Sequence, residues 1–203
     1  MPTENQLDEA VQGVIDKDLI ESRRVIPKPG EELRVFGYGS LMWHPDFPYI
    51  DIVPAALHGY HRAFCIRSTH YRGTREKPGL VLGLDRGGMC HGRMFRVKPE
   101  HAQQVADALH ARELVTGVYE PRWLKLRLEN GRHATALGYV ADRQHPQYAG
   151  KLDVAEIARR IRGAIGKTGS NVEYLRNTVL HLEQMGIHEG TLHRVLRQVE
   201  QGQ

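Results

Sequence analysis

The chain has 203 residues, 40% hydrophobic and 26% charged, which is the usual composition of a folded globular domain and argues against a disordered or fibrous protein. Its formal net charge of +4 at pH 7 comes from Lys and Arg residues scattered among acids, without a nucleic-acid-binding motif, so we expect no nucleic-acid partner. The apolar runs fall far short of the roughly 20 residues that a membrane-spanning helix needs, so we expect no membrane partner either.

The first 30 residues are predicted to form an amphipathic helix and a linker. Residues 5–21 place apolar side chains at helical spacing behind Asn5, a plausible N-cap, and the breaker sequence PKPG at 27–30 follows. We therefore predict one main domain over residues 31–203, with the helix as an appendage. The N-terminus lacks the basic and apolar regions of a signal peptide, so we expect a cytoplasmic protein.

Residues 33–97 carry the pattern of several short strands. The segments LRVFGY, AALHGYHRAFCI, GLVLGL and MCHGRMFRV are rich in apolar residues and separated by Pro and Gly. The sequence DRGG at 85–88 has the composition of a hairpin connection, so we predict a turn there. This part of the chain predicts an antiparallel or mixed sheet.

A helix and a hairpin come next. Residues 98–113 have Pro99 in the first helical turn and apolar residues on one face, which predicts a helix ending near Glu113. In RWLKLRLE the leucines alternate with charged residues, as in a half-buried strand, and Asn130-Gly131 is a preferred sequence for a two-residue hairpin loop.

The last third is helical by pattern. Asp153–Glu156 and Ser170–Glu173 read as capping boxes ahead of amphipathic runs, and Thr191–Val199 repeats the apolar spacing. Gly166 and Gly186 are predicted to end the first two helices. Strands, an inserted helix, a hairpin and then helices predict the α+β class, with a sheet that could close as a barrel.

The pattern of cysteines and histidines predicts neither a disulfide framework nor a metal site. Cys65 and Cys90 lack CxxC spacing and are expected to be buried thiols. His188 and His193 in HEGTLH imitate a zinc-protease motif, but they are five residues apart rather than four and diverge on a helix surface.

The stretch VFGYGSLMW at 35–43 is unusual for a simple turn. Two glycines flank Tyr38, and large apolar residues resume directly after Ser40. It fits neither the dinucleotide fingerprint, whose third glycine is missing, nor the esterase motif, which needs glycine where Met42 stands. Glycines let the backbone turn sharply and bring its N–H groups to a carboxylate or phosphate. Two interpretations remain at this point: a ligand-binding turn, or a structural bend.

Glu113 is the candidate general base. At the C-terminal end of a helix the dipole disfavours a carboxylate and raises its pKa, which suits a base. The alternative is a solvated glutamate paired with Arg112, and these residues alone leave both open.

Four motifs together resemble the ChaC-type, glutathione-specific γ-glutamylcyclotransferases. They are FGYGSLMWHPDFPY, THYRGTREKPG, ARELVTGVY and GSNVEYL, which occur in the family's order between about Arg34 and Met185. The resemblance implies an α+β fold, with a small mixed β-barrel and flanking helices. It also implies a reaction without metal or other cofactor, in which the free amine of a γ-glutamyl group attacks its own side-chain carbonyl. Glutathione is thereby converted to 5-oxoproline and cysteinylglycine.

The resemblance also implies roles for individual residues. Glu113 matches the family's catalytic glutamate, and Tyr174 matches a tyrosine that lines the site. The loop that holds the γ-glutamyl group falls on Tyr38, Gly39, Ser40 and Leu41. One departure is the sequence ELVTGVY, which inserts three residues between the glutamate and the Gly-aromatic pair found close behind it in some members. This departure bears on which downstream residues shape the pocket.

Arg72, Arg75 and Lys77 lie in the basic loop YRGTREKPG. Of these, Arg72 is predicted to attract glutathione or hold its glycine carboxylate, against the alternative of a solvated basic loop. Two further functions stay open: a cyclotransferase for other γ-glutamyl amino acids or amines, and a non-catalytic binder of γ-glutamyl ligands. The sequence does not predict the oligomeric state.

Overall fold

The computed structural model describes residues 21–202, which divide into two compact units. The first unit comprises residues up to Arg62 together with Gly83–Tyr148, and the second comprises Ala63–Leu82 and Ala149–Gln203. The long strands β2 (Asp51–Ser68) and β3 (Gly79–Val97) each begin in one unit and end in the other. Most of the predicted N-terminal helix, residues 5–20, lies outside the described residues. The helices within 21–202 include none with the length and apolar character needed to cross a membrane.

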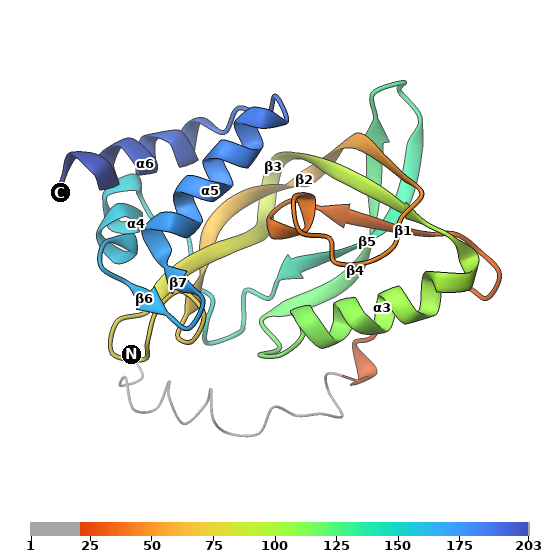
Figure 1. Ribbon diagram of the computed structural model, residues 1–203, viewed down its shortest axis with the longest axis horizontal. Helices are drawn as coiled ribbons and strands as arrows, with labels where there is room; N and C mark the ends of the chain where they lie inside the picture. The colour runs from red at the N-terminus through yellow and green to blue at the C-terminus, as the bar shows by residue number, and fades with distance from the viewer. Residues whose placement is uncertain (1–20, 203) are drawn as a thin grey trace. The chain divides into compact units, whose positions relative to one another are not determined.

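Five strands close into a barrel in the order β1-β3-β2-β4-β5 (Figure 1). β1 (Leu33–Gly37) pairs antiparallel with β3 and parallel with β5 (His133–Ala141), so the sheet is mixed. β4 (Tyr119–Leu128) pairs antiparallel with both β2 and β5. The predicted α+β class with a small mixed β-barrel and flanking helices is confirmed.

One helix of the first unit, α3 (Pro99–Glu113), packs its apolar face on β1 and β5. Pro99 opens the helix as predicted, because the missing N–H of proline costs nothing in the first turn. Leu109, 2% exposed, is among the buried side chains of this core, and such burial contributes about 1.5–3 kcal/mol for each side chain. This packing fixes the position of the last turn of α3, which carries Glu113.

Two of the predicted turns are wrong in detail. The DRGG segment is not a turn between strands, because β3 continues through it; Gly87 and Gly88 adopt positive φ values of 99° and 71° within the strand, as at a bulge. The hairpin at Asn130-Gly131 exists, but its loop is longer than two residues. The Leu128 N–H donates to the Arg132 carbonyl across it (2.8 Å), and Gly131 adopts a φ of 78°.

The second unit contains three helices joined by short connections (Figure 1). α4 (Val154–Ile161) and α5 (Asn171–Gln184) begin at the predicted caps, since Asp153 and Ser170 accept hydrogen bonds from first-turn N–H groups. α6 (Gly190–Gln201) covers the predicted third run and packs on α4 and α5.

Of the two glycines predicted to end helices, Gly186 is confirmed and Gly166 is wrong. Gly186, with a φ of 69°, follows the end of α5 as predicted. Gly166 does not end α4: that helix stops at Ile161, and Gly166 belongs to β6 (Ile165–Gly166), which pairs with β7 (Gly169–Ser170). A Cβ at Gly166 would lie 2.4 Å from the Tyr71 carbonyl carbon, so the glycine here permits a close backbone approach.

Candidate active site

The GYGSL loop leaves the end of β1 and forms a single 3₁₀ turn, η1 (Ser40–Met42). Within the turn the Met42 N–H donates to the Gly39 carbonyl (2.9 Å) and the Trp43 N–H donates to the Ser40 carbonyl (3.1 Å). These bonds leave the N–H groups of Ser40 and Leu41 at the start of the turn for other acceptors. Leu41 and Met42 are buried, as the return to apolar residues predicted, and they anchor the turn from behind.

Close packing explains the first glycine of the motif. A Cβ at Gly37 would lie 3.1 Å from the Phe95 ring and 3.3 Å from the Leu41 Cβ, so a larger residue would push the turn away from the barrel. The role of Gly37 is therefore structural, and it places the loop that follows.

Arg62 on β2 holds the loop from inside the first unit. Its guanidinium donates to the Tyr38 carbonyl through Nε and to the His91 carbonyl through Nη2 (2.6 Å), while the residue is only 4% exposed. Sequence analysis missed this residue. The available signal was its register: Arg62 falls on the same face of the strand as Phe64 and Ile66, which are buried.

Glu113 is the last residue of α3, as predicted. Burial raises the pKa of its carboxyl group above the ordinary value, and the adjacent Arg112 opposes this shift. The predicted direction of the pKa shift is confirmed, but its main cause is loss of hydration rather than the helix dipole. The alternative interpretation was right about the partner, since Arg112 Nε lies 3.3 Å from Glu113 Oε1, and wrong about solvation, since the Glu113 side chain is only 18% exposed.

Arg112 connects Glu113 to the loop. Its Nη2 donates to Ser40 Oγ (3.0 Å), and its Nη1 donates to the His44 carbonyl and to Asp46 Oδ2 (both 3.1 Å). One guanidinium therefore contacts the carboxylate at the end of α3 and three groups of the segment that begins with the GYGSL loop. The structure brings Ser40 and Glu113 onto one guanidinium within the first unit, whereas the sequence analysis considered Arg112 only as a neutralising partner of Glu113.

Arg72 and Tyr174 belong to the second unit, where the structure brings them together. The Arg72 guanidinium carbon lies 5.2 Å from the centre of the Tyr174 ring, in a cation–π arrangement, and Arg72 Nη1 donates to the Ser170 carbonyl (3.4 Å). The Tyr174 hydroxyl accepts a hydrogen bond from the Leu82 N–H (3.5 Å). Arg72 is thus an ordered side chain rather than a freely solvated one.

Asn171 fixes the start of the helix that carries Tyr174. It is fully buried, its Oδ1 accepts from the Leu80 N–H (2.7 Å), and its Nδ2 donates to the Leu80 carbonyl (2.8 Å). The amide reproduces the pairing of a neighbouring strand and ties α5 to β3 within the second unit. The GSNVEYL motif therefore combines a helix cap, a strand contact and an aromatic side chain.

The first unit places a partly buried carboxylate near a turn whose first N–H groups point to no partner within the turn. A partly buried carboxylate with a raised pKa is a better proton acceptor than an ordinary one, which suits it to take and return a proton.

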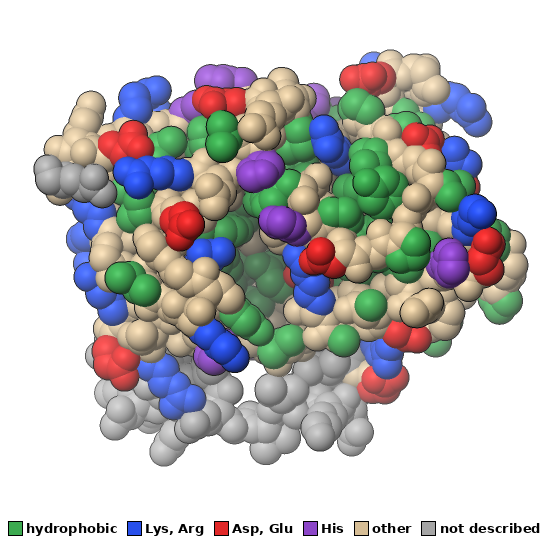
Figure 2. Space-filling model, viewed as in Figure 1, with side chains coloured by type: hydrophobic (Ala, Val, Ile, Leu, Met, Phe, Trp, Pro, Cys, Tyr) green, Lys and Arg blue, Asp and Glu red, His purple; other side chains and the backbone are tan. Residues whose placement is uncertain are grey.

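Residues 21–202 contain no group of three or more His, Cys, Asp or Glu side chains that could hold a metal ion. Cys65 and Cys90 are buried thiols, as predicted. Basic and acidic side chains are scattered over the face of the molecule in Figure 2.

Comparisons with known proteins agree with the motifs. A family model described as "ChaC-like protein" matches residues 33–202. The glutathione-specific γ-glutamylcyclotransferase of Escherichia coli is 37% identical over 166 residues, covering 82% of this chain and 72% of that protein. The human glutathione-specific γ-glutamylcyclotransferase 1 is 36% identical and covers 71% and 67% respectively. A crystal structure of the yeast γ-glutamyl cyclotransferase specific to glutathione has a TM-score of 0.76 at 25% identity, covering 84% of this chain and 96% of the yeast chain.

Proposed function

The chain belongs to the ChaC-like protein family, and we propose that it is a glutathione-degrading γ-glutamylcyclotransferase that releases 5-oxoproline and cysteinylglycine. The observation that carries the proposal is Glu113, a partly buried carboxylate at the end of α3 whose guanidinium partner also holds the GYGSL loop. A protein that only binds γ-glutamyl compounds has no need of a base in that position.

The reaction requires that the γ-glutamyl chain be held in a bent conformation and that one group accept a proton. When the γ-glutamyl chain is bent so that its α-amine faces its own γ-carbonyl, ring closure is intramolecular, and holding that geometry supplies much of the rate advantage. The amine starts as an ammonium and must first lose a proton. The raised pKa of Glu113 suits it for this step, because a base works best when its pKa lies near the operating pH.

The proton then has a defined path. Glu113 takes it from the ammonium, the amine nitrogen bonds to the γ-carbonyl carbon, and a tetrahedral intermediate forms. When the bond to the cysteinyl nitrogen breaks, that nitrogen takes the bonding electron pair and receives the proton from Glu113, which restores the base. The ring nitrogen gives up its second proton as the lactam forms, and the released amine of cysteinylglycine takes up one proton to become an ammonium, so the protons balance. We assign the N–H groups of Ser40 and Leu41, at the start of η1, as the donors to the substrate's anionic groups.

The remaining roles complete the proposal. Tyr38, Gly39, Ser40 and Leu41 are assigned to binding of the γ-glutamyl group, and Arg72 and Tyr174 to binding of the substrate as well. The cytoplasmic location, the absence of a cofactor and the domain over 31–203 stay predictions.

The test is 5-oxoproline formation from reduced glutathione by the purified protein and by Glu113→Gln. We expect the substitution to lower kcat at least about 100-fold, the usual contribution of a general base. Glu100→Gln is the matched control, because it makes the same change in the first turn of α3, where the side chain is exposed. Equal activity of the wild type and Glu113→Gln would contradict the assignment of the base.

The same assay separates the alternatives. Turnover of γ-glutamylalanine at a rate equal to that of glutathione would indicate a cyclotransferase for other γ-glutamyl compounds, since only the leaving-group pocket differs. Binding of these compounds without turnover of any of them would indicate a non-catalytic binding protein.

A further inference from the structure

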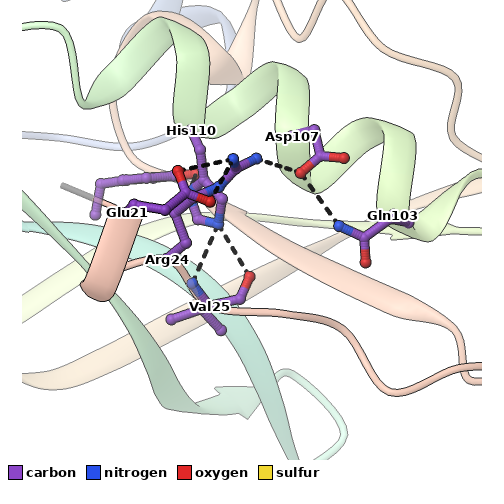
Figure 3. Close-up of polar contacts among 7 residues, drawn as sticks. Glu21, Arg24, Val25, Gln103, Asp107 and His110 are labelled. Atoms are coloured by element: carbon purple, nitrogen blue, oxygen red, sulfur yellow. Dashed lines mark hydrogen bonds and ion pairs between the residues drawn. The ribbon is translucent and has the colours of Figure 1, made fainter. Parts of the chain in front are cut away.

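A short segment ahead of β1, the strap of residues 23–25, is bound to α3 (Figure 3). Arg24 forms ion pairs with Glu21 and with Asp107 on the helix. Val25 is half-buried and packs against the core that α3 shares with the barrel. The strap lies in the first unit and outside residues 33–202, the part of the chain that matches the family. Its role is therefore not one that the motifs assign.

His110 binds the strap one helical turn before Glu113. His110 is 4% exposed, and its Nε2 lies 3.2 Å from the Val25 nitrogen and 2.9 Å from the Val25 oxygen (Figure 3). Either neutral tautomer of the ring finds a partner there, because Nε2 can accept from the N–H or donate to the carbonyl. The other ring nitrogen, Nδ1, lies 3.0 Å from the Tyr139 hydroxyl on β5. The imidazole is thus fixed on both sides, and the helical turn is fixed with it.

The strap and the end of α3 form a closed ring of hydrogen bonds. The His110 carbonyl accepts from the Leu114 N–H (3.0 Å), which caps α3 directly after the base. The Leu114 carbonyl accepts from the Gly117 N–H (3.1 Å), and the Gly117 carbonyl accepts from Arg23 Nη1 (3.4 Å). Because Val25 contacts His110, the ring begins and ends in the strap. The base lies in the segment that this ring encloses, between His110 and Leu114.

Arg23 also anchors the ring to the barrel. Its Nη1 lies 3.3 Å from Asp142 Oδ2, directly after β5. The Asp142 N–H donates to the Val118 carbonyl (2.9 Å), next to the ring. The turn that the ring encloses contains residues 114–116, the three residues by which the motif ELVTGVY departs from some members of the family. The strap therefore supports an enlarged turn directly after the base.

We propose that Arg23 is a positioning residue for Glu113, because its contact with the Gly117 carbonyl closes the ring that fixes the end of α3. This inference rests on the proposed function, in which Glu113 is the base. A helix end frays easily, since its last carbonyl groups have no partners within the helix. The ring restricts this motion on both sides of the base, and a displacement of about 1 Å in an active site can cost about 100-fold in rate. The strap thus acts on kcat through the position of the carboxylate.

The test is a measurement of kcat and KM for glutathione in Arg23→Met and Arg34→Met. Arg23→Met keeps an unbranched side chain at a partly exposed position and removes both contacts of the guanidinium. We expect kcat to fall about tenfold with KM within about twofold of the wild type, because the base is displaced and the other contacts of the strap with α3 remain. Arg34→Met is the matched control, since it makes the same change in β1, where Arg34 pairs with Glu32 (3.2 Å). Both constants should stay unchanged in this control.

Hydrogen exchange measured by NMR tests the strap without substrate. The Leu114 amide reports on the last turn of α3, and the Ala106 amide, in the middle of the same helix, is the internal control. In Arg23→Met we expect exchange about tenfold faster at Leu114 and unchanged at Ala106, because only the end of the helix opens more often. A merely structural role would lower global stability and accelerate both amides. Equal acceleration of the two amides, or no acceleration at Leu114, would overturn the inference.

The kinetic outcomes decide the inference independently. An unchanged kcat in Arg23→Met, a rise in KM alone, or an equal loss of kcat in Arg34→Met would overturn it. If the wild type does not convert glutathione, the proposed function fails, while hydrogen exchange at Leu114 still decides whether Arg23 holds the end of α3.

Discussion

Replacing Arg112 by methionine should move the pH dependence of catalysis. The substitution keeps an unbranched side chain of similar length and removes the charge that lies 3.3 Å from the Glu113 carboxylate. A neighbouring cation favours the ionised form of a carboxylate, so its removal raises the pKa of Glu113 beyond the shift that burial already causes. Glu113 then ionises at higher pH, and the acid limb of kcat/KM follows it upward.

The size of the displacement follows from the geometry. At 3.3 Å, Coulomb's law gives about 1.3 kcal/mol with the dielectric constant of water and about 5 kcal/mol with an effective value of about 20. The Arg112 side chain is 32% exposed, so solvent screening places the effect near the lower figure. A pKa unit corresponds to about 1.4 kcal/mol, and we therefore expect a displacement of about 1 pH unit.

The assay measures kcat/KM for glutathione against pH in the wild type, Arg112→Met and Arg122→Met. Arg122 is the matched control, because it is in the same unit, carries the same charge and pairs with Glu120 (2.6 Å). Ionisation of the substrate amine is common to all three proteins, so a difference between their limbs belongs to the enzyme. Arg112→Met should also lower the maximum value of kcat/KM, because the Ser40 hydroxyl loses the hydrogen bond from Arg112. The pH at which kcat/KM falls to half of its maximum does not depend on the height of that maximum.

Two results would refute this reasoning. The first is an acid limb at the same pH in Arg112→Met and the wild type, which would mean that the guanidinium does not stabilise the ionised base. The second is an equal displacement in Arg122→Met, which would assign the effect to the net charge of the protein rather than to the contact with Glu113.

The other predictions concern the second unit. Asn171→Ala leaves the N–H and carbonyl of Leu80 without their partners and should destabilise the protein by about 3 kcal/mol, or roughly 6–12 °C in Tm. Calorimetry against Asn177→Ala, an exposed position on the same helix, checks this, and equal Tm values would contradict it. Arg72→Met should raise KM for glutathione about tenfold with little change in kcat, because it removes a binding contact and not the base. An unchanged KM, or the same rise in the exposed Arg75→Met, would remove Arg72 from the site.

Helices and loops that are marked by residues within or next to them could be predicted from the sequence. α3, α4 and α5 were found through Pro99, Asp153 and Ser170, since the N-terminus of a helix depends on residues within one turn of it. Ser40 and Glu113 were predicted as site residues through motif order, which depends on no long-range contact, and the structure places both in contact with Arg112.

Elements set by distant contacts could not be predicted. The sequence DRGG has the composition of a turn, but the strand continues through it, and the His61 ring nitrogen lies 3.0 Å from the Gly87 carbonyl. Gly166 looks like a helix stop, but its place is set by the Tyr71 backbone, which leaves no room for a side chain. In both cases the partner lies at least 25 positions away in the chain, where local propensity carries no information.

Contacts between distant residues also determine the site. For this reason the predicted rise of the Glu113 pKa was right in direction, but the helix dipole was the wrong main cause. The position of Glu113 at a helix end is local and can be read from the sequence, whereas its burial follows from how α3 packs in the folded unit, which depends on residues distant in the chain. Burial of the carboxylate and contact with Arg112 act in opposite directions on its pKa, and burial is the larger effect. Because Arg112 also binds Ser40, its guanidinium couples the position of the loop to the basicity of Glu113. A substrate that displaces Arg112 from Glu113 on binding would raise the pKa of the base as the ammonium arrives, and the free energy for that change would come from the contacts of the substrate with the loop.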